Sequence, residues 1–424
     1  MSTEPEMESM ESESGEELQE SDFTKPLSLE EIQEKSDKYL LGTYRRAPKA
    51  FYFGQGEYLY DSENNAYLDF LCGISVTNLG HGEADLIEAI RDQADRIMHS
   101  SNLFYNQEQA LLAEALIEHS FPGKVFLCNS GTEANEAALK LARRNGESMA
   151  DTPVILALEN SFHGRTTGAM ALTGQDKIRK GFGPLIDGIH HIPANDIEAL
   201  ESAFEQYEGR ISAMIMELVQ GEGGIQPMSQ DFVSRARELT QSSNALLILD
   251  EIQTGIGRTG KLFAYEHYKI RPDAMTLAKA LGGGLPIGAM VVAEEFTDLL
   301  QPGMHGSTFG GNHVVARAAY ENLRIIVGRE VLKNAEGLSE YFFRRLKLLQ
   351  QSCSLVKEVR GIGLHIGVEL NDHGPDVVRR CLEEKLLINC TAGHVIRIMP
   401  PLNLSLDSAA EGLDIFEKVV REFA

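Results

Sequence analysis

The chain has 424 residues, of which 43% are hydrophobic and 24% charged, values typical of a globular protein with an ample core. Its formal net charge of −24 argues against nucleic acid or an anionic membrane as its main partner. At roughly 100–200 residues per domain, this length predicts two or three domains.

The first element in chain order is an acidic segment, which we predict to be a disordered tail over residues 1–28. Between Met1 and Asp22 there are nine acidic residues and neither Lys nor Arg. Such a segment has too few apolar side chains to offset the entropy that it would lose on ordering. It also differs from a transit peptide, which is rich in Arg and poor in acids.

The cellular location is predicted from two further features. No run approaches the ~18 apolar residues of a membrane span, and no secretory signal follows Met1. The five cysteines are scattered and contain no C-x-x-C pair, which indicates a reducing compartment and no metal site. We therefore expect a cytoplasmic protein.

Two distant segments, residues 29–76 and 311–424, are predicted to form one small α+β domain. The first holds a helix and then GEYLYDSENNAYLDF, which predicts a hairpin with a polar turn. The second holds a long helix followed by the strand candidates Gly363–Leu370 and Val395–Met399.

Residues 77–310 between them are predicted to form a large α/β domain. Short apolar runs alternate there with helical patterns such as EANEAALKLARR and QDFVSRARELT, which indicates a mostly parallel sheet. Several runs are continuously apolar, as in strands covered on both faces. The strand candidates are 125–128, 154–158, 211–218, 246–249, 274–278 and 289–293. Because ligands of such sheets bind beyond the carboxyl ends of the strands, the residues after each run are the candidates for function.

The first strand candidate is followed by Asn129-Ser130-Gly131-Thr132-Glu133. Ser130 and Glu133 have the spacing of a capping box, so a well-capped helix explains the motif by itself. The alternative is an anion site, in which Gly131 permits close approach and Thr132 adds a hydroxyl at a positive helix end. Without a G-K-[ST] sequence, a nucleoside triphosphate is not expected there.

The second strand candidate is followed by Ser161-Phe162-His163-Gly164-Arg165. These side chains are either exposed to solvent without a role in binding, or they belong to a loop that binds a ligand. In the second case Phe162 suits the face of a planar cofactor and Arg165 suits a carboxylate.

Asp250 and Glu251 end the run LLIL. A buried acid needs a positive partner, so an internal ion pair is the plain explanation. The following GIGRTG also has the G-x-G-x-x-G spacing of a nicotinamide-dinucleotide site. That alternative is weak, because KLFAYEHY is a poor crossover helix and no acid stands about 20 residues later.

Lys279 follows the run AMTLA and precedes three glycines. A single lysine is most often solvated. This one is placed at the carboxyl edge of the sheet, in a loop that can wrap a ligand.

Six segments, in order, resemble the class III aminotransferases, which are fold-type I enzymes dependent on pyridoxal 5′-phosphate. They are SGTEANEAALKLARR, SFHGRTTGAM, ELVQGEGGI, LLILDEIQTGIGRTG, TLAKALGGGLPIGAM and HGSTFGGN. The resemblance extends from about residue 35 to the end of the chain. It implies a large domain with a mostly parallel seven-stranded sheet and a smaller α+β domain built from both chain ends. One departure is Gly-Glu-Ala-Asp after His81, where the family usually has a His-Pro-containing run.

The resemblance also assigns roles to single residues. It implies that Lys279 binds the cofactor covalently and acts as the catalytic base, and that Asp250 pairs with the pyridine nitrogen. Phe162 would stack on the ring and Gln253 would lie beside the ring oxygen. The implied phosphate anchors are Gly131, Thr132 and, from the partner subunit of a homodimer, Thr308. The implied substrate contacts are Arg165, Glu222, Ser307 and Arg397.

Within the class, GISVTNLGH and VIRIMPPLN are most similar to the branch that moves the δ-amino group of N2-acetyl-L-ornithine to 2-oxoglutarate in arginine biosynthesis. Succinylornithine, ornithine and 4-aminobutyrate are alternative donors, because they require the same motifs. A non-catalytic regulator is a further alternative, but such a protein would have no need of Lys279 and Asp250.

Overall fold

The structure is a computed structural model that describes residues 26–149 and 152–424. Most of the predicted tail, residues 1–25, lies outside the described residues. The chain falls into two units, one containing 26–53 with Tyr60–Asn65 and the other Gly54–Leu59 with Ala66–Ala424. In the first unit, helix α1 (Leu29–Tyr39) begins with a capping box formed by Ser28 and Glu31.

The larger unit contains the predicted seven-stranded sheet, with the strand order β4-β12-β11-β10-β7-β5-β6. Within this sheet, β12 runs antiparallel to its neighbours, β11 and β4, and the other pairings are parallel. Its strands are β4 (Gly123–Cys128), β5 (Val154–Leu158), β6 (Ile189–Ile192), β7 (Ile211–Met216), β10 (Leu246–Asp250), β11 (Ala274–Leu277) and β12 (Gly288–Ala293). Six of them coincide with the predicted apolar runs. The seventh, β6, reads Ile-His-His-Ile and lies at the sheet edge, where polar residues are tolerated.

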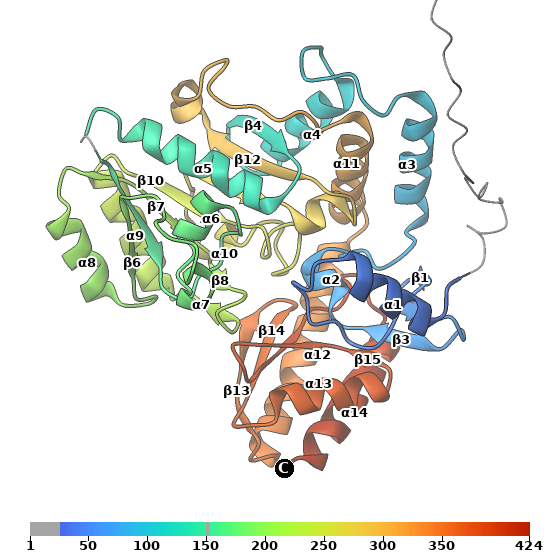
Figure 1. The fold of residues 1–424 in the computed structure, drawn as a ribbon. Helices are drawn as coiled ribbons and strands as arrows, with labels where there is room; N and C mark the ends of the chain where they lie inside the picture. Colours follow the sequence, from blue (N-terminus) through green and yellow to red (C-terminus); the bar gives the residue numbers. More distant parts are fainter. Residues whose placement is uncertain (1–25, 150–151) are drawn as a thin grey trace, which may run out of the picture. The chain divides into compact units, whose positions relative to one another are not determined.

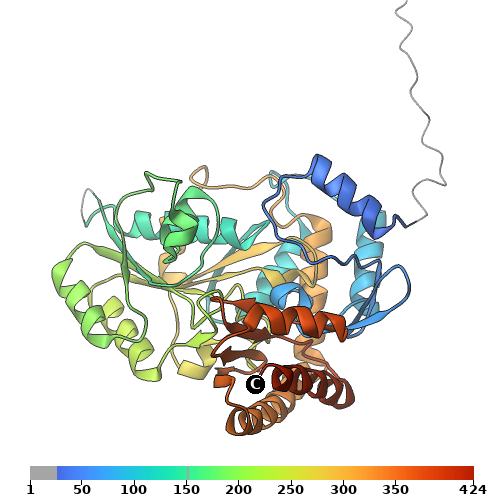
Figure 2. The ribbon, with the colours of Figure 1, turned by 60° about the horizontal axis from the view of Figure 1, so that its bottom comes forward.

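Both faces of this sheet are covered, which explains its continuously apolar strands. In β5, Ile155 and Ala157 belong to the core under helix α5 (Gly131–Asn145). Leu156 and Leu158, which point the other way, belong to the core shared with α8 (Ile197–Gln206) and α9 (Gln230–Ser242). Figures 1 and 2 show α5 and these two helices on opposite sides of the strands. Polar groups can therefore gather at the carboxyl edge of the sheet, which these layers leave open.

The glycines after β10 form an irregular turn, and the next helix, α10 (Tyr265–Tyr268), has only four residues. The nicotinamide alternative is therefore wrong, because its crossover helix is not formed at this turn. Gly257 instead has φ +90°, and a Cβ atom there would lie 2.6 Å from Leu402 Cδ1. A glycine is required at this position by backbone conformation and close packing.

The C-terminal part of this unit contains a second sheet, with the order β13-β14-β17-β16. Its strands are β13 (Val356–Ile362), β14 (His365–Leu370), β16 (Asn389–Thr391) and β17 (Val395–Ile398), and its helices are α11 (His313–Gly328), α12 (Val331–Ser352), α13 (Gly374–Glu383) and α14 (Leu406–Glu422). β15 (Leu386–Leu387) pairs in parallel with β3 (Ala66–Asp69). Segments near both chain ends thus join, although the predicted domain boundaries at residues 76 and 310 stay a prediction.

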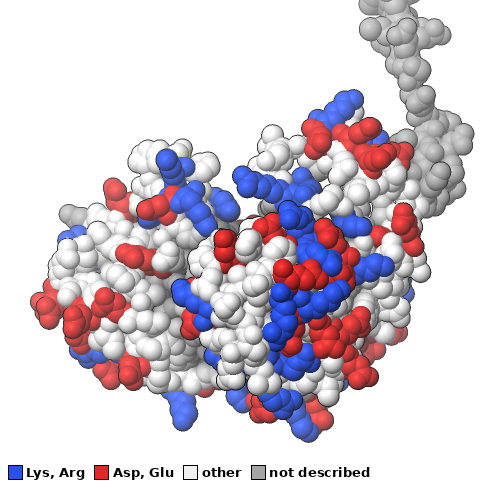
Figure 3. Space-filling view, turned by 90° about the horizontal axis from the view of Figure 1, so that it is seen from below, with Lys and Arg blue, Asp and Glu red and all other residues white. Residues whose placement is uncertain are grey.

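Exposed faces of α12, α13 and α14 carry ion pairs between helices, such as Arg345 with Asp414 and Arg380 with Glu422. Figure 3 shows acidic and basic side chains interspersed on this face. None of the helices in the described ranges combines the length and apolarity that a membrane span requires. The remaining elements are β1 (Phe53–Gln55), β2 (Tyr58–Tyr60), α2 (Cys72–Ser75), α3 (Ala84–Arg96), α4 (Gln107–Glu118), α6 (Thr167–Leu172), α7 (Asp176–Arg179), β8 (Val219–Gln220) and β9 (Gln226–Pro227).

Candidate active site

A cavity of about 380 Å³ lies at the carboxyl ends of β4, β5, β7, β10 and β11, within the usual size range of small-molecule sites. It brings together seven residues that the sequence predicted from five different segments. They are Gly131, Thr132, Phe162, Glu222, Asp250, Gln253 and Lys279. Residues that follow separate strands thus line one cavity, which makes it the candidate site.

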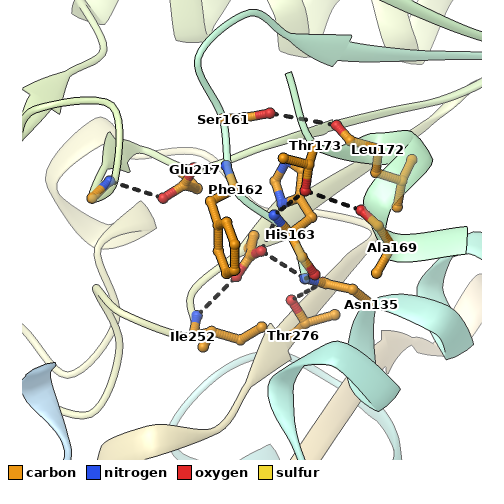
Figure 4. Close-up of polar contacts among 12 residues, drawn as sticks. Asn135, Ser161, Phe162, His163, Ala169, Leu172, Thr173, Glu217, Ile252 and Thr276 are labelled. Carbon is orange, nitrogen blue, oxygen red and sulfur yellow. Dashed lines mark hydrogen bonds and ion pairs between the residues drawn. The ribbon is translucent and has the colours of Figure 1, made fainter. Parts of the chain in front are cut away.

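Asp250 ends β10 and is 3% exposed. Its Oδ2 accepts hydrogen bonds from Asn135 Nδ2 at 2.8 Å and His163 Nδ1 at 2.7 Å. Its Oδ1 accepts from the backbone N of Ile252 at 3.1 Å. Figure 4 shows Asn135, His163 and the backbone of Ile252 close together beside Phe162. The carboxylate is thus held in one orientation beside the cavity.

His163 and Asn135 belong to this arrangement, and sequence reasoning did not select them. Burial by itself lowers the pKa of His163, but the hydrogen bond and charge of Asp250 outweigh burial and raise the pKa. Asn135 is held in turn by Thr276 Oγ1, which donates to its Oδ1 at 2.8 Å. His163 stands in the quoted SFHGR segment, but its buried partner is 87 residues away. No local pattern identifies that partner.

The N-terminus of α5 forms the end of the cavity expected to bind an anion. Ser130 Oγ accepts from Glu133 N at 3.2 Å, as predicted. The other half of the capping box differs, because Glu133 Oε2 accepts from Asn129 N at 2.8 Å. The N–H groups of Gly131 and Thr132, in the first helical turn, have no intrahelical acceptor. With the helix dipole they form a site suited to phosphate.

Phe162 lines the cavity, and its backbone N donates to Glu217 Oε1 at 2.9 Å. Glu217 was not selected from the sequence, because only the fold places it beside this ring. Burial raises the pKa of Glu217 to about 7, so this carboxyl titrates near neutrality. Arg165 is exposed, with its Cζ atom 5.7 Å from the Phe162 ring centroid, and it is not among the lining residues.

Lys279 follows β11 with φ +46°, a backbone conformation that non-glycine residues rarely adopt. Such strain persists where the surrounding structure imposes it, often at functional sites. Burial, and then the positive charge of Arg397, lower the pKa of Lys279 to about 8. A substantial fraction of the amine is therefore neutral, and nucleophilic, near physiological pH.

This value predicts the pH dependence of Lys279 in cofactor-free protein. Reductive trapping with a small aldehyde should increase as pH rises through about 8, because deprotonation produces the reactive amine. Unperturbed lysines should follow a midpoint near ~10.4. Mass spectrometry of the Lys279 peptide against surface-lysine peptides measures both curves, and coincident curves would contradict the prediction.

Arg397, on β17, lies behind the cavity wall with its side chain 1% exposed. Its Nη1 donates to Glu222 Oε1 at 2.6 Å, and its Nε donates to Asn389 Oδ1 at 3.1 Å. Burial raises the pKa of Glu222, but Arg397 lowers it further, so the net shift is downward. Glu222 therefore stands as a carboxylate between Arg397 and the cavity.

Ser307 and Thr308 are not among the residues that line the cavity. Ser307 Oγ accepts from Asn129 Nδ2 at 3.1 Å, while Thr308 is exposed. The described chain thus places Ser307 near the α5 end of the site and does not bring Thr308 into the cavity.

The residues around the cavity fit pyridoxal 5′-phosphate, the cofactor implied by the resemblance. A helix N-terminus suits the phosphate, and an aromatic side chain suits the ring face. Asp250 provides a fixed negative charge for a protonated ring nitrogen. Lys279 provides an amine that is partly neutral near pH 7. The chemistry of this set of groups matches the cofactor at its phosphate, its ring and its aldehyde.

Comparisons with known proteins agree with this geometry. The family model described as "Aminotransferase class-III" matches residues 45–420. The acetylornithine aminotransferase of Caldanaerobacter subterraneus subsp. tengcongensis is 46% identical over 388 residues, which cover 91% of this chain and 98% of the relative. The crystal structure of ornithine aminotransferase from Toxoplasma gondii matches with TM-score 0.91 and 32% identity, covering 95% of this chain and 97% of that one. Acetylornithine aminotransferase from Elizabethkingia anophelis matches with TM-score 0.84 and 32% identity, covering 94% and 100%.

Proposed function

Because the chain belongs to the class III aminotransferases, we propose that it moves the δ-amino group of N2-acetyl-L-ornithine to 2-oxoglutarate. The products are N-acetyl-L-glutamate 5-semialdehyde and L-glutamate, and the pathway is arginine biosynthesis. One observation carries the proposal: Lys279 and Asp250 meet in one cavity of a chain that aligns with acetylornithine aminotransferases over nearly its full length. We further propose a cytoplasmic location.

The cofactor of this family, pyridoxal 5′-phosphate, serves when bound as an electron sink for the substrate carbanion. Asp250 keeps the ring nitrogen protonated, because an opposite charge favours the charged form. Lys279 would act as the base that takes a proton from the carbon bearing the transferred amino group, and then as the acid that delivers it to C4′ of the bound cofactor. The N-terminus of α5 holds the phosphate, and Phe162 orients the ring.

A panel of amino donors with 2-oxoglutarate tests the proposed substrate. We expect kcat/KM to be highest for N2-acetyl-L-ornithine and lower for succinylornithine, ornithine and 4-aminobutyrate. A higher value for another donor would replace the proposed substrate while leaving the aminotransferase activity intact.

We also propose that Glu222 masks Arg397 in one half-reaction and exposes it in the other. The donor reacts through its distal amine, whereas 2-oxoglutarate reacts next to its α-carboxylate, so one arginine cannot meet both substrates in the same way. The backbone of Glu222 is held by Thr391 Oγ1, which donates to its carbonyl at 2.9 Å. Its side chain, paired with Arg397, is then the part that must move.

Glu222→Ala should therefore raise the reactivity of glutamate relative to N2-acetyl-L-ornithine. If the Glu222–Arg397 pair disfavours glutamate by ~1.4 kcal/mol, the ratio should change about tenfold. Half-reaction rates with each donor in single turnover measure this ratio. Glu222→Gln is the matched variant, since it keeps an oxygen acceptor for Arg397 and removes the charge. An unchanged donor ratio in both variants would count against the mask.

We propose that the active unit is a homodimer with shared sites. Large apolar side chains are exposed beside the loop that carries Thr308, which supports an interface there. Asn102 Nδ2 donates to Ser307 O at 2.9 Å, so the segment around Asn102 lies against the loop that carries Ser307 and Thr308. The exposed residues are Ile97, Met98, Leu103, Phe104, Tyr105 and Phe309. In a two-fold dimer, one such interface would complete two sites, each with Thr308 from the partner subunit.

Mixing two inactive variants tests this arrangement. Lys279→Ala disables its own site, and Thr308→Glu should repel the cofactor phosphate in the neighbouring site. A mixed dimer then has one site with both defects and one with neither. Random pairing of equal amounts should restore up to about a quarter of wild-type activity. No recovery, with mixed dimers demonstrated by native mass spectrometry, would place both residues in the same chain's site.

A further inference from the structure

Behind the cavity, the side-chain amide of Gln253 lies between two nitrogen donors from the C-terminal sheet. His365 Nε2 is 2.9 Å from Gln253 Oε1, and Arg397 Nη1 is 3.5 Å from the same oxygen. His365 begins β14 and is completely buried, and Arg397 is on the adjacent strand, β17. Neither the resemblance nor the strand-end argument selected His365.

The contacts determine which nitrogen of His365 carries the proton. Arg397 can only donate hydrogen bonds, so the Gln253 atom that faces it is the oxygen. That oxygen must also accept from His365, whose Nε2 is therefore protonated. His365 Nδ1 has no hydrogen-bond partner among the described residues. An unprotonated nitrogen there avoids burying an unsatisfied N–H donor.

The surroundings also keep His365 neutral. Burial, and then the positive charges of Arg397, Arg258 and Lys279, lower the pKa of His365 far below its usual value. Its Nε2–H is therefore a permanent donor over the working pH range. The Gln253 amide is confined on its other side, because a Cβ atom on Gly221 would lie 2.1 Å from Oε1 and 3.0 Å from Nε2.

We propose that His365 is a positioning residue for this site. Its Nε2–H fixes the Gln253 oxygen away from the cavity, so that the Gln253 NH₂ group donates into the cavity. The inference rests on the proposed function in one respect, namely that the acceptor there is the ring oxygen of pyridoxal phosphate. Without His365, Gln253 Oε1 keeps only the long contact with Arg397, so the amide is held less firmly in the orientation that donates to that acceptor.

The test compares His365→Leu, which removes the donor, with His365→Gln, which retains an amide N–H. Absorption of the bound cofactor is recorded against pH without any amino donor, so the result does not depend on the identity of the substrate. In His365→Leu the pH at the midpoint of the absorption change should rise by about one unit. Loss of a donor leaves more negative charge on the ring oxygen, and this charge favours the protonated form of the bound cofactor. His365→Gln should stay near wild type. His190→Leu is a matched control, since His190 is on the edge strand β6 and contacts Tyr207 instead of Gln253.

Two further measurements separate positioning from a merely structural role. In a Gln253→Ala background, His365→Leu should cause no additional shift of the midpoint. In cofactor-free wild type, ¹⁵N-histidine NMR should contain an Nε2–H resonance that does not titrate between about pH 6 and 9 and that is lost in the His365→Gln spectrum. An unchanged midpoint in His365→Leu, an equal shift in both backgrounds, or an Nδ1–H form of His365 would overturn the proposal. If His365→Leu does not fold, two other results decide the proposal. They are the ring nitrogen of His365 that carries the proton in the NMR spectrum, and the pH midpoint of cofactor absorption in His365→Gln.

Discussion

Lys279→Ala should lose turnover by at least the 10²–10⁴-fold typical of a lost proton-transfer group, and by more because the covalent link to the cofactor is also lost. The cofactor should still bind, since the N-terminus of α5 and the Phe162 ring do not depend on the amine. Turnover with N2-acetyl-L-ornithine and 2-oxoglutarate measures the loss, and absorption of the dialysed protein measures the bound cofactor.

Lys279→Arg is the matched variant, because it keeps a positive charge but cannot act as a base near neutral pH. A small primary amine added to Lys279→Ala should restore part of the rate by supplying the missing base. Full activity in Lys279→Ala would remove this residue from the mechanism.

Asp250→Asn should slow both half-reactions, by on the order of 10²–10⁴-fold, because the ring nitrogen loses the negative charge that keeps it protonated. The NH₂ group of the substituted amide would also face a donor: Asn135 and His163 if it takes the place of Oδ2, or the Ile252 backbone N–H if it takes the place of Oδ1. Single-turnover rates with each substrate measure the effect on chemistry apart from binding.

Asp273→Asn is the control for simple loss of a buried acid. Asp273 is also buried, accepts from Leu247 N at 2.7 Å and pairs with Arg237, but it is not among the residues that line the cavity. We expect Asp273→Asn to lower the free energy of unfolding without changing the half-reaction rates of the folded enzyme. If Asp250→Asn behaved in the same way, Asp250 would be a structural acid only.

Much of the fold was predictable because its strands are covered on both faces. An apolar run such as Val154–Leu158 must be buried on both sides. The helical pattern of Gly131–Asn145 is preceded by its own capping residue, Ser130. The edge strand β6 escaped prediction because its two histidines do not meet this requirement. The same local logic identified Asp250 and Lys279, which end or follow apolar strands.

Other parts of the site depend on contacts that no local pattern contains. His163 meets Asp250 across 87 residues, and His365 meets Gln253 across 112. Arg397 and Glu222, 175 residues apart, were paired only through the family resemblance, and the fold brings their charged atoms within 2.6 Å. The position of Thr308 relative to a partner subunit is likewise not encoded in the order of residues along one chain.

The sequence by itself determined which segments are strands and helices and which polar side chains stand at strand ends, because periodicity, capping and burial act over a few residues. The tertiary structure alone decided which of those ends face one cavity. That choice follows from the strand order β4-β12-β11-β10-β7-β5-β6 and from the docking of β14 and β17 behind Gln253. Both are set by packing between segments that are far apart in the chain, for which local patterns carry no information.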